Sequence, residues 1–98
     1  MTRGLERALT RSAALAGAEL AIERHRMTPW HSATFSGARH DILASAMSGD
    51  RLDQWLAQLS ALDLPLRGGL LTDIRVAAWE RAGAMTRLRI ESVTLDTG

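Results

Sequence analysis

The sequence feature that most constrains the fold is a pair of alternating runs in residues 70–95. Apolar residues stand two apart in both runs. They include Ile74, Val76, Leu88 and Ile90. Such alternation is typical of a β-strand with one buried face. The stretch Glu80–Ala84 between the runs contains Gly83, so the pattern predicts a β-hairpin that turns there.

Two registers of this hairpin keep the apolar residues on one face. One pairs Val76 with Leu88, and the other pairs Val76 with Ile90. The second register sets Arg75 against Glu91, whereas the first places like charges opposite each other. Because directly opposed like charges are unfavourable, charge favours the second register.

The turn favours the first register instead. There Gly83 would occupy the left-handed position of a three-residue loop. We favour the second register on charge, which sets Trp79 beside Arg87.

Two other segments have helical spacing of apolar residues, 3–16 and 50–62. Gly17 suits the left-handed position just past the end of the first helix. Asp50 or Ser48 can cap the start of the second helix. The apolar stripe of that helix consists of Leu52, Trp55, Leu56, Leu59 and Leu62.

Residues 18–27 and 32–47 alternate in the manner of strands. Pro29 lacks a backbone donor, so pairing should end there or move to a sheet edge. The apolar residues of the second strand change parity along its length. A β-bulge at Gly37–Ala38 would account for this change.

The order of elements is therefore α-β-β-α-β-β. We expect residues 1–98 to form a single α+β domain, a length typical of one domain. Its core would be a four-stranded antiparallel sheet with two helices on one face, a split or permuted ferredoxin-like arrangement.

The composition narrows the chemistry. There is no Cys, so disulfides, thiol chemistry and thiolate metal ligands are excluded. All 12 basic residues are Arg, yet the formal net charge is only +1, which makes a dedicated nucleic-acid binder unexpected. No signal peptide or membrane-spanning run is present, so we expect no membrane partner and a cytoplasmic location.

The stretch WHSATFSGARH, residues 30–40, is the strongest candidate for chemistry. Its histidines, together with His25, could bind a metal or move a proton. Their spacing matches no strong metal or catalytic signature, so we assign no catalytic, metal or cofactor residue and favour a structural role. The alternative is a small ligand-binding or enzymatic domain that uses His31, Arg39 and His40.

Apolar residues at outward positions indicate association. We expect Leu71, Ala77, Trp79, Val93 and Leu95 to face away from the helices. A sheet with one bare face is commonly covered in a dimer, so the leading hypothesis is a non-catalytic homodimerisation or protein-interaction domain.

The candidate binding surface consists of Trp30, His31, Arg39, His40, Trp79 and Arg87. A further alternative is weak anion or nucleic-acid binding through one face of the first helix. That face carries Arg3, Arg7 and Arg11, four residues apart.

Two resemblances accompany this interpretation. The segment 30–40, with the stretch LPLRG at 64–68 and Asp73, resembles a small uncharacterised family of alphaproteobacterial proteins, from about Glu23 to Leu95. This resemblance implies a shared bacterial fold and no known activity. The αββαββ order with the Leu–Trp helix is similar in architecture to the periplasmic domain of type II secretion M-type proteins, which carry a membrane anchor.

Overall fold

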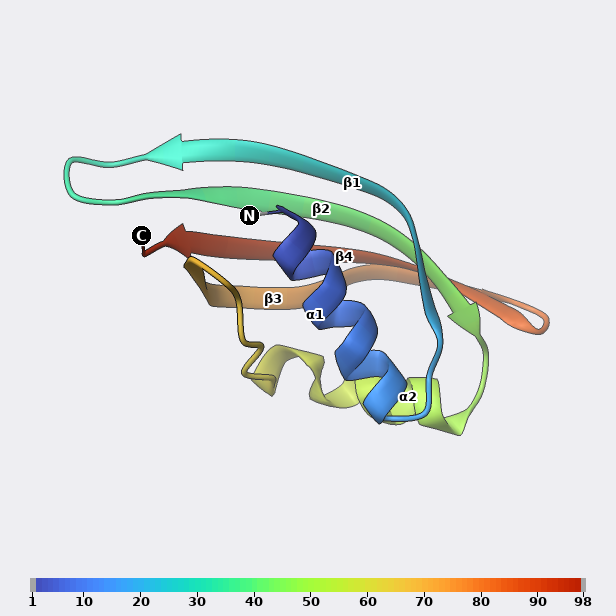
Figure 1. Cartoon of the computed structure of the whole chain (residues 1–98). Helices are drawn as coiled ribbons and strands as arrows, with labels where there is room; N and C mark the ends of the chain where they lie inside the picture. The colour runs from blue at the N-terminus through green and yellow to red at the C-terminus, as the bar shows by residue number, and fades with distance from the viewer. Residues whose placement is uncertain (1, 98) are drawn as a thin grey trace.

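A computed structural model describes residues 2–97, without the side chains of Thr2 and Arg3. The element order confirms the α-β-β-α-β-β prediction (Figure 1). The elements are α1 (Thr2–Leu15), β1 (Leu20–His31), β2 (Ser36–Met47), α2 (Asp50–Gln58), the short 3₁₀ helix η1 (Leu59–Ala61), β3 (Gly69–Ala82) and β4 (Met85–Asp96).

The four strands form one sheet in the order β1-β2-β4-β3, and every neighbouring pair is antiparallel. Moving the last strand to the front of the chain would give the order β-α-β-β-α-β. The fold is therefore a circular permutation of the ferredoxin-like arrangement. Both helices lie on the same side of the sheet, which leaves the other side uncovered (Figure 1).

Helix α1 ends as the sequence predicts. Gly17 has a φ of 87°, a conformation that L side chains rarely adopt. The N–H of Ala18 donates to the carbonyl of Ala13 at 2.8 Å, and the N–H of Gly17 donates to Ala14 at 3.0 Å. This pair of bonds is a Schellman motif, and it turns the chain into β1.

Helix α2 begins differently from the prediction. Gly49 is the N-cap residue, and no side chain caps the helix. The hydroxyl of Ser48 instead bonds to that of Thr86 at 2.7 Å. The indole N–H of Trp55 donates to Ser12 Oγ at 2.9 Å, which ties α2 to α1.

The core lies between the helices and the covered side of the sheet. Its fully buried members from the helices are Leu5, Leu9, Ala13, Leu52, Trp55 and Leu59. The sheet contributes Leu20, Ile42, Ala44, Ala46, Ile74, Leu88 and Ile90. These residues stand two apart on their strands, as the alternation predicts for a sheet with one buried face.

Strands β1 and β2 correct two predictions. No register shift occurs at Gly37–Ala38, and the only irregularity between these strands lies between Ile22 and Arg24 of β1. The parity change in the sequence arises because residues 32–35 form a loop rather than part of β2. Strand β1 ends at His31 rather than at residue 27, and it lies at the sheet edge, as the second alternative for Pro29 predicts, because one side of an edge strand needs no donor.

The β3–β4 hairpin confirms the register favoured by charge. Val76 pairs with Ile90, and Arg75 pairs with Glu91. The turn is shorter than predicted, because Ala82 already pairs with Met85. Gly83 has a φ of 63° at the first central position of this two-residue turn.

Bulges near Thr72 and Ala77 reconcile this turn with the register, and they change which side two residues face. Leu71 pairs with buried Thr94 and packs against the core. Trp79 pairs with Leu88 rather than with Arg87. Both side chains therefore lie on the helix side of the sheet, contrary to the prediction, whereas Val93 and Leu95 face away from it.

Candidate functional site

The uncovered side of the sheet, here called the open face, is built from alternate residues of four long strands. Its members follow from the register: Arg24, Arg26, Thr28 and Trp30 of β1; Gly37, Arg39, Asp41, Leu43, Ser45 and Met47 of β2; Leu70, Asp73, Arg75, Ala78 and Glu80 of β3; and Met85, Arg87, Arg89, Glu91, Val93 and Leu95 of β4.

Ion pairs occupy the middle of the open face. Arg89 donates two hydrogen bonds to Asp41, each at 3.0 Å, and also contacts Glu91 at 3.3 Å. Glu91 accepts a hydrogen bond from Arg75 as well. The bond from Arg89 holds the pKa of Asp41 below its usual value, and the nearby positive charges act in the same direction.

A second pair joins the open face to the bulge of β1. Arg87 donates to Glu23 at 2.8 Å. This hydrogen bond lowers the pKa of Glu23 and raises that of Arg87. Because both partners are exposed, such a pair adds little to stability by itself.

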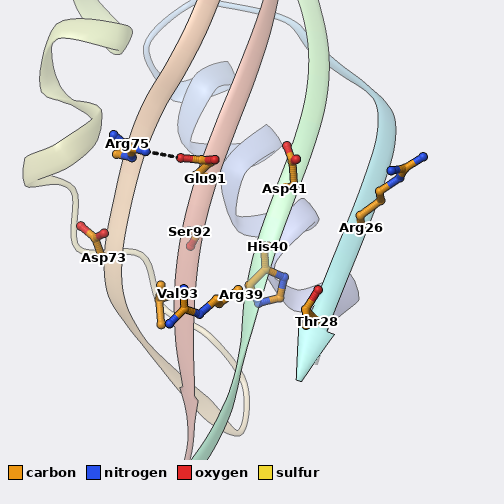
Figure 2. Close-up of a pocket in the computed structure, with 10 residues that line it drawn as sticks. All are labelled: Arg26, Thr28, Arg39, His40, Asp41, Asp73, Arg75, Glu91, Ser92 and Val93. Atoms are coloured by element: carbon orange, nitrogen blue, oxygen red, sulfur yellow. Dashed lines mark hydrogen bonds and ion pairs between the residues drawn. The ribbon is translucent and has the colours of Figure 1, made fainter. Parts of the chain in front are cut away.

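A shallow hollow of about 500 Å³ lies between these charges, and Figure 2 shows the residues that line it. Arg39 lies across β4 over Val93, while Arg26 points outward from β1. Asp73 borders the hollow on the β3 side. Acidic and basic groups alternate around its rim, so the hollow has no strong preference for one sign of ligand.

Unpaired charges on the open face are separated by sign. Arg24, Arg26 and Arg39 of the β1–β2 half form no ion pair with another described residue. On β3, Asp73 and Glu80 are likewise without an ion-pair partner among residues 2–97. Free positive charge therefore lies towards one edge of the sheet and free negative charge towards the other.

Apolar side chains occupy both ends of the open face. At one end lie Trp30, Leu95 and Leu70, the last 55% exposed. At the other end Met47 and Met85 pair across β2 and β4, with exposures of 69% and 44%. We call these sets the Trp30 end and the methionine end.

The Trp30 end depends on a glycine. A Cβ at Gly37 would come within 2.8 Å of the Trp30 ring and would also clash with the backbone oxygen of Thr94. The indole therefore lies directly over the glycine backbone between β1 and β2. Gly37 is needed here for this close approach and not for a bulge.

On the helix side, a chain of three hydrogen bonds connects α1 to three strands. Glu6 Oε2 lies 2.9 Å from Nδ1 of His25. Nε2 of His25 lies 2.8 Å from Nδ1 of His40, whose Nε2 lies 2.8 Å from Thr94 Oγ1. We call this set the histidine chain.

The histidine chain is closed to solvent at its inner end. His40 is 4% exposed and Thr94 is 7% exposed. Burial, reinforced by the charge of His25, lowers the pKa of His40 to about 4. His40 is therefore neutral at pH 7, with one ring nitrogen donating and the other accepting.

This arrangement supports a structural tie rather than catalysis. A hydroxyl bonded to a histidine is the start of a nucleophilic relay, but a relay must reach a substrate. Thr94 is buried among the strands, so a substrate cannot reach its hydroxyl oxygen. Residues 4–97 contain no group of three or more His, Asp or Glu side chains suited to a metal ion. The ring nitrogens that His25 and His40 turn toward each other are already bonded.

The residues predicted as a binding surface are divided between the two sides of the sheet. Trp30, Arg39 and Arg87 lie on the open face, whereas His40 lies in the histidine chain. His31 is exposed at the last position of β1. His31, Arg39 and His40 thus do not form one cluster, although Arg39 and His40 both border the hollow of Figure 2.

Trp79 lies in a separate hollow beside α2. This hollow of about 470 Å³ is lined by Leu56, Ala57 and Val76 among others. The guanidinium of Arg81 lies 6.0 Å from the Trp79 ring centroid and bonds to Asp53 at 2.6 Å. Trp79 therefore belongs to the junction of α2 with the hairpin.

Of the predicted arginine ridge on α1, Arg7 and Arg11 are exposed, and the side chain of Arg3 lies outside the described residues. The sequence analysis did not identify Glu6 or Thr94 as partners of histidine. The signal that could have found the histidine pair is the β1–β2 register. With His25 opposite Ile42, His40 becomes its diagonal neighbour.

Comparison with protein-family models, curated proteins and solved structures gives no match to this chain. The two resemblances described above therefore stay predictions. Within residues 2–97, no helix combines the length and hydropathy needed to cross a membrane.

Proposed function

We propose that this protein is a small non-catalytic bacterial interaction domain of the cytoplasm that forms a homodimer through the open face. The observation that carries the proposal is the pair of apolar ends on a sheet face that no helix covers. Exposed Leu70, Met47 and Met85 are costly to leave in water, and an isologous interface would remove them.

Two other routes of association are blocked. Both edge strands carry charges and bulges, and β1 also contains Pro29. These features discourage pairing of an edge with another strand. The protein's own helices cover the middle of the helix side, where Met27 and Trp79 stay exposed only at its borders, whereas no helix covers the open face.

A second copy of the chain is the partner that best fits this face. Its charges number six Arg, at 24, 26, 39, 75, 87 and 89, against four acidic residues, at 41, 73, 80 and 91, with Glu23 nearby. A face so nearly balanced gives little attraction to a polyanion. It can, however, match the same face of an identical molecule.

The test is light scattering after size-exclusion chromatography over a wide range of concentrations. We expect a dimer for the wild-type chain and a shift to monomer for Leu70→Arg. The matched control is Leu15→Arg, since Leu15 is 84% exposed at the end of α1 and away from the open face. A wild-type chain that stays monomeric, or an equal loss of dimer in the control, overturns the proposal.

A further inference from the structure

A second hollow of the open face adjoins the one in Figure 2 and shares Arg26 and Asp41 with it. Its volume is about 280 Å³, and its lining residues are Arg24, Arg26, Asp41, Leu43 and Arg89. We call it the arginine hollow. We infer that it is a binding site for inorganic phosphate, held by three guanidinium groups and by the Asp41 carboxylate. All of these groups belong to one chain, so the inference is independent of the proposed homodimer.

The strand register builds the arginine hollow. Leu43 of β2 pairs with Arg24 of β1 on one side and with Arg89 of β4 on the other. The side chain of Leu43 has no hydrogen-bonding group, so it does not occupy the donors of its two neighbours. Two residues further along the strands, Arg26 lies opposite Asp41. The register therefore places three positive charges and one negative charge around an apolar floor.

The arginines of this hollow keep unused donors. Arg89 bonds to Asp41 through Nε and Nη2, which leaves its Nη1 without a hydrogen bond to another described residue. Arg24 and Arg26 form no ion pair within residues 2–97. Figure 2 shows Arg26 extended outward from β1, so it can turn over the hollow without breaking an ion pair. Guanidinium forks match the oxygens of a phosphate group in geometry and in charge.

Asp41 determines which anion fits. The bond from Arg89, together with the charges of Arg24 and Arg26, holds the pKa of Asp41 below its usual value, so Asp41 is ionised at pH 7. An ionised carboxylate only accepts hydrogen bonds. Inorganic phosphate keeps a proton near pH 7 and can donate a hydrogen bond to Asp41, whereas sulfate has no proton to donate and is repelled. A phosphate ester has lost most of its second proton at pH 7, because that pKa is about 6, so free phosphate fits better.

The test is a titration of isotope-labelled protein with inorganic phosphate, followed by amide NMR at pH 7 and constant ionic strength. We expect saturable shifts at Arg24, Arg26 and Leu43. The Kd should lie in the millimolar range, because the hollow is open to water. Sulfate and glycerol phosphate should each bind more weakly than inorganic phosphate under the same conditions.

Variants separate the site from the net charge of the protein. The test variant carries Arg24→Gln and Arg26→Gln. The matched control carries Arg7→Gln and Arg11→Gln, which remove the same charge from exposed positions of α1. We expect the Kd for phosphate to rise about tenfold or more in the test variant and to change little in the control. Asp41→Asn should bind sulfate about as well as phosphate, because an amide can also donate.

Three results would overturn the inference. They are the absence of saturable shifts in the wild-type chain, an equal rise in Kd in the test and control variants, and wild-type binding of sulfate as tight as that of phosphate. Tighter binding of glycerol phosphate than of phosphate would overturn the assignment to the free anion. Sedimentation equilibrium of the same samples distinguishes the two proposals. A monomer that binds phosphate would refute the homodimer alone, and a dimer that binds none would refute this site alone.

Discussion

Burial of His40 should make the protein less stable in mild acid. The unfolded chain takes up a proton at His40 below its ordinary pKa of 6.5, whereas the folded chain does so only near the lowered value of about 4. Between these two values unfolding binds a proton, so the free energy of unfolding falls as the pH falls. The contribution is fully present above pH 6.5 and lost by pH 4.

The size of the effect follows from the two pKa values. The difference between 6.5 and about 4 corresponds to about 3 kcal/mol in all. Between pH 7.5 and pH 5 the loss is about 2 kcal/mol. This window lies above the usual pKa values of the carboxylates, so the lowered pKa values of Asp41 and Glu23 contribute little to it.

The assay is urea unfolding followed by circular dichroism at several pH values and one protein concentration. The test variant is His40→Gln, which should be less stable at pH 7.5 and should lose most of the dependence on pH. The control is His31→Gln, because His31 is exposed and outside the histidine chain. If His40→Gln keeps the full wild-type loss between pH 7.5 and 5, the burial of His40 is not its cause.

Two further predictions concern single side chains near the histidine chain. Gly37→Ala should lower the free energy of unfolding by roughly 1–3 kcal/mol, because the new methyl group meets the Trp30 ring and the Thr94 backbone; unchanged urea unfolding would show that β2 can shift to admit it. Thr94→Val should cost about 1–3 kcal/mol by leaving a buried nitrogen of His40 unpaired. Ser92→Ala, at a neighbouring buried site whose hydroxyl has no partner among the described residues, should be close to neutral. Equal losses at Thr94 and Ser92 in thermal unfolding would contradict the hydrogen-bond assignment.

Periodicity alone was enough to predict the order of elements and to reduce the β3–β4 hairpin to two registers. Both depend on patterns that extend over many residues, which a single irregularity does not erase. The charge pair Arg75–Glu91 selected the register because opposed charges act locally across two strands.

Bulges were the main source of error. One extra residue near Ala77 turns Trp79 to the helix side, and no composition signal marks that position. The bulge expected at Gly37–Ala38 was inferred from a parity change that the 32–35 loop explains. Glycine is required at position 37 because the Trp30 ring of the neighbouring strand lies against its backbone.

The candidate site was predicted only in part for a related reason. Side chains that are neighbours in sequence, such as Arg39 and His40, point to opposite sides of a strand. The histidine chain joins residues 6, 25, 40 and 94, and such contacts depend on strand pairing and on the placement of α1. Alternation predicted the open-face residues Val93 and Leu95 of the regular strand β4, whereas the bulges of β3 put Leu71 and Trp79 on the helix side.

The most direct test of the open-face dimer uses the methionines of the unmodified chain. Met85 and Met27 have similar exposures, 44% and 48%, but Met85 lies on the open face and Met27 on the helix side. Oxidation by dilute peroxide, followed by peptide mass spectrometry, measures how accessible each sulfur is. As the protein concentration rises, we expect oxidation of Met47 and Met85 to slow while that of Met27 stays constant. Protection of Met27 alone, or unchanged rates at Met47 and Met85 once dimers have formed, would contradict an interface on the open face.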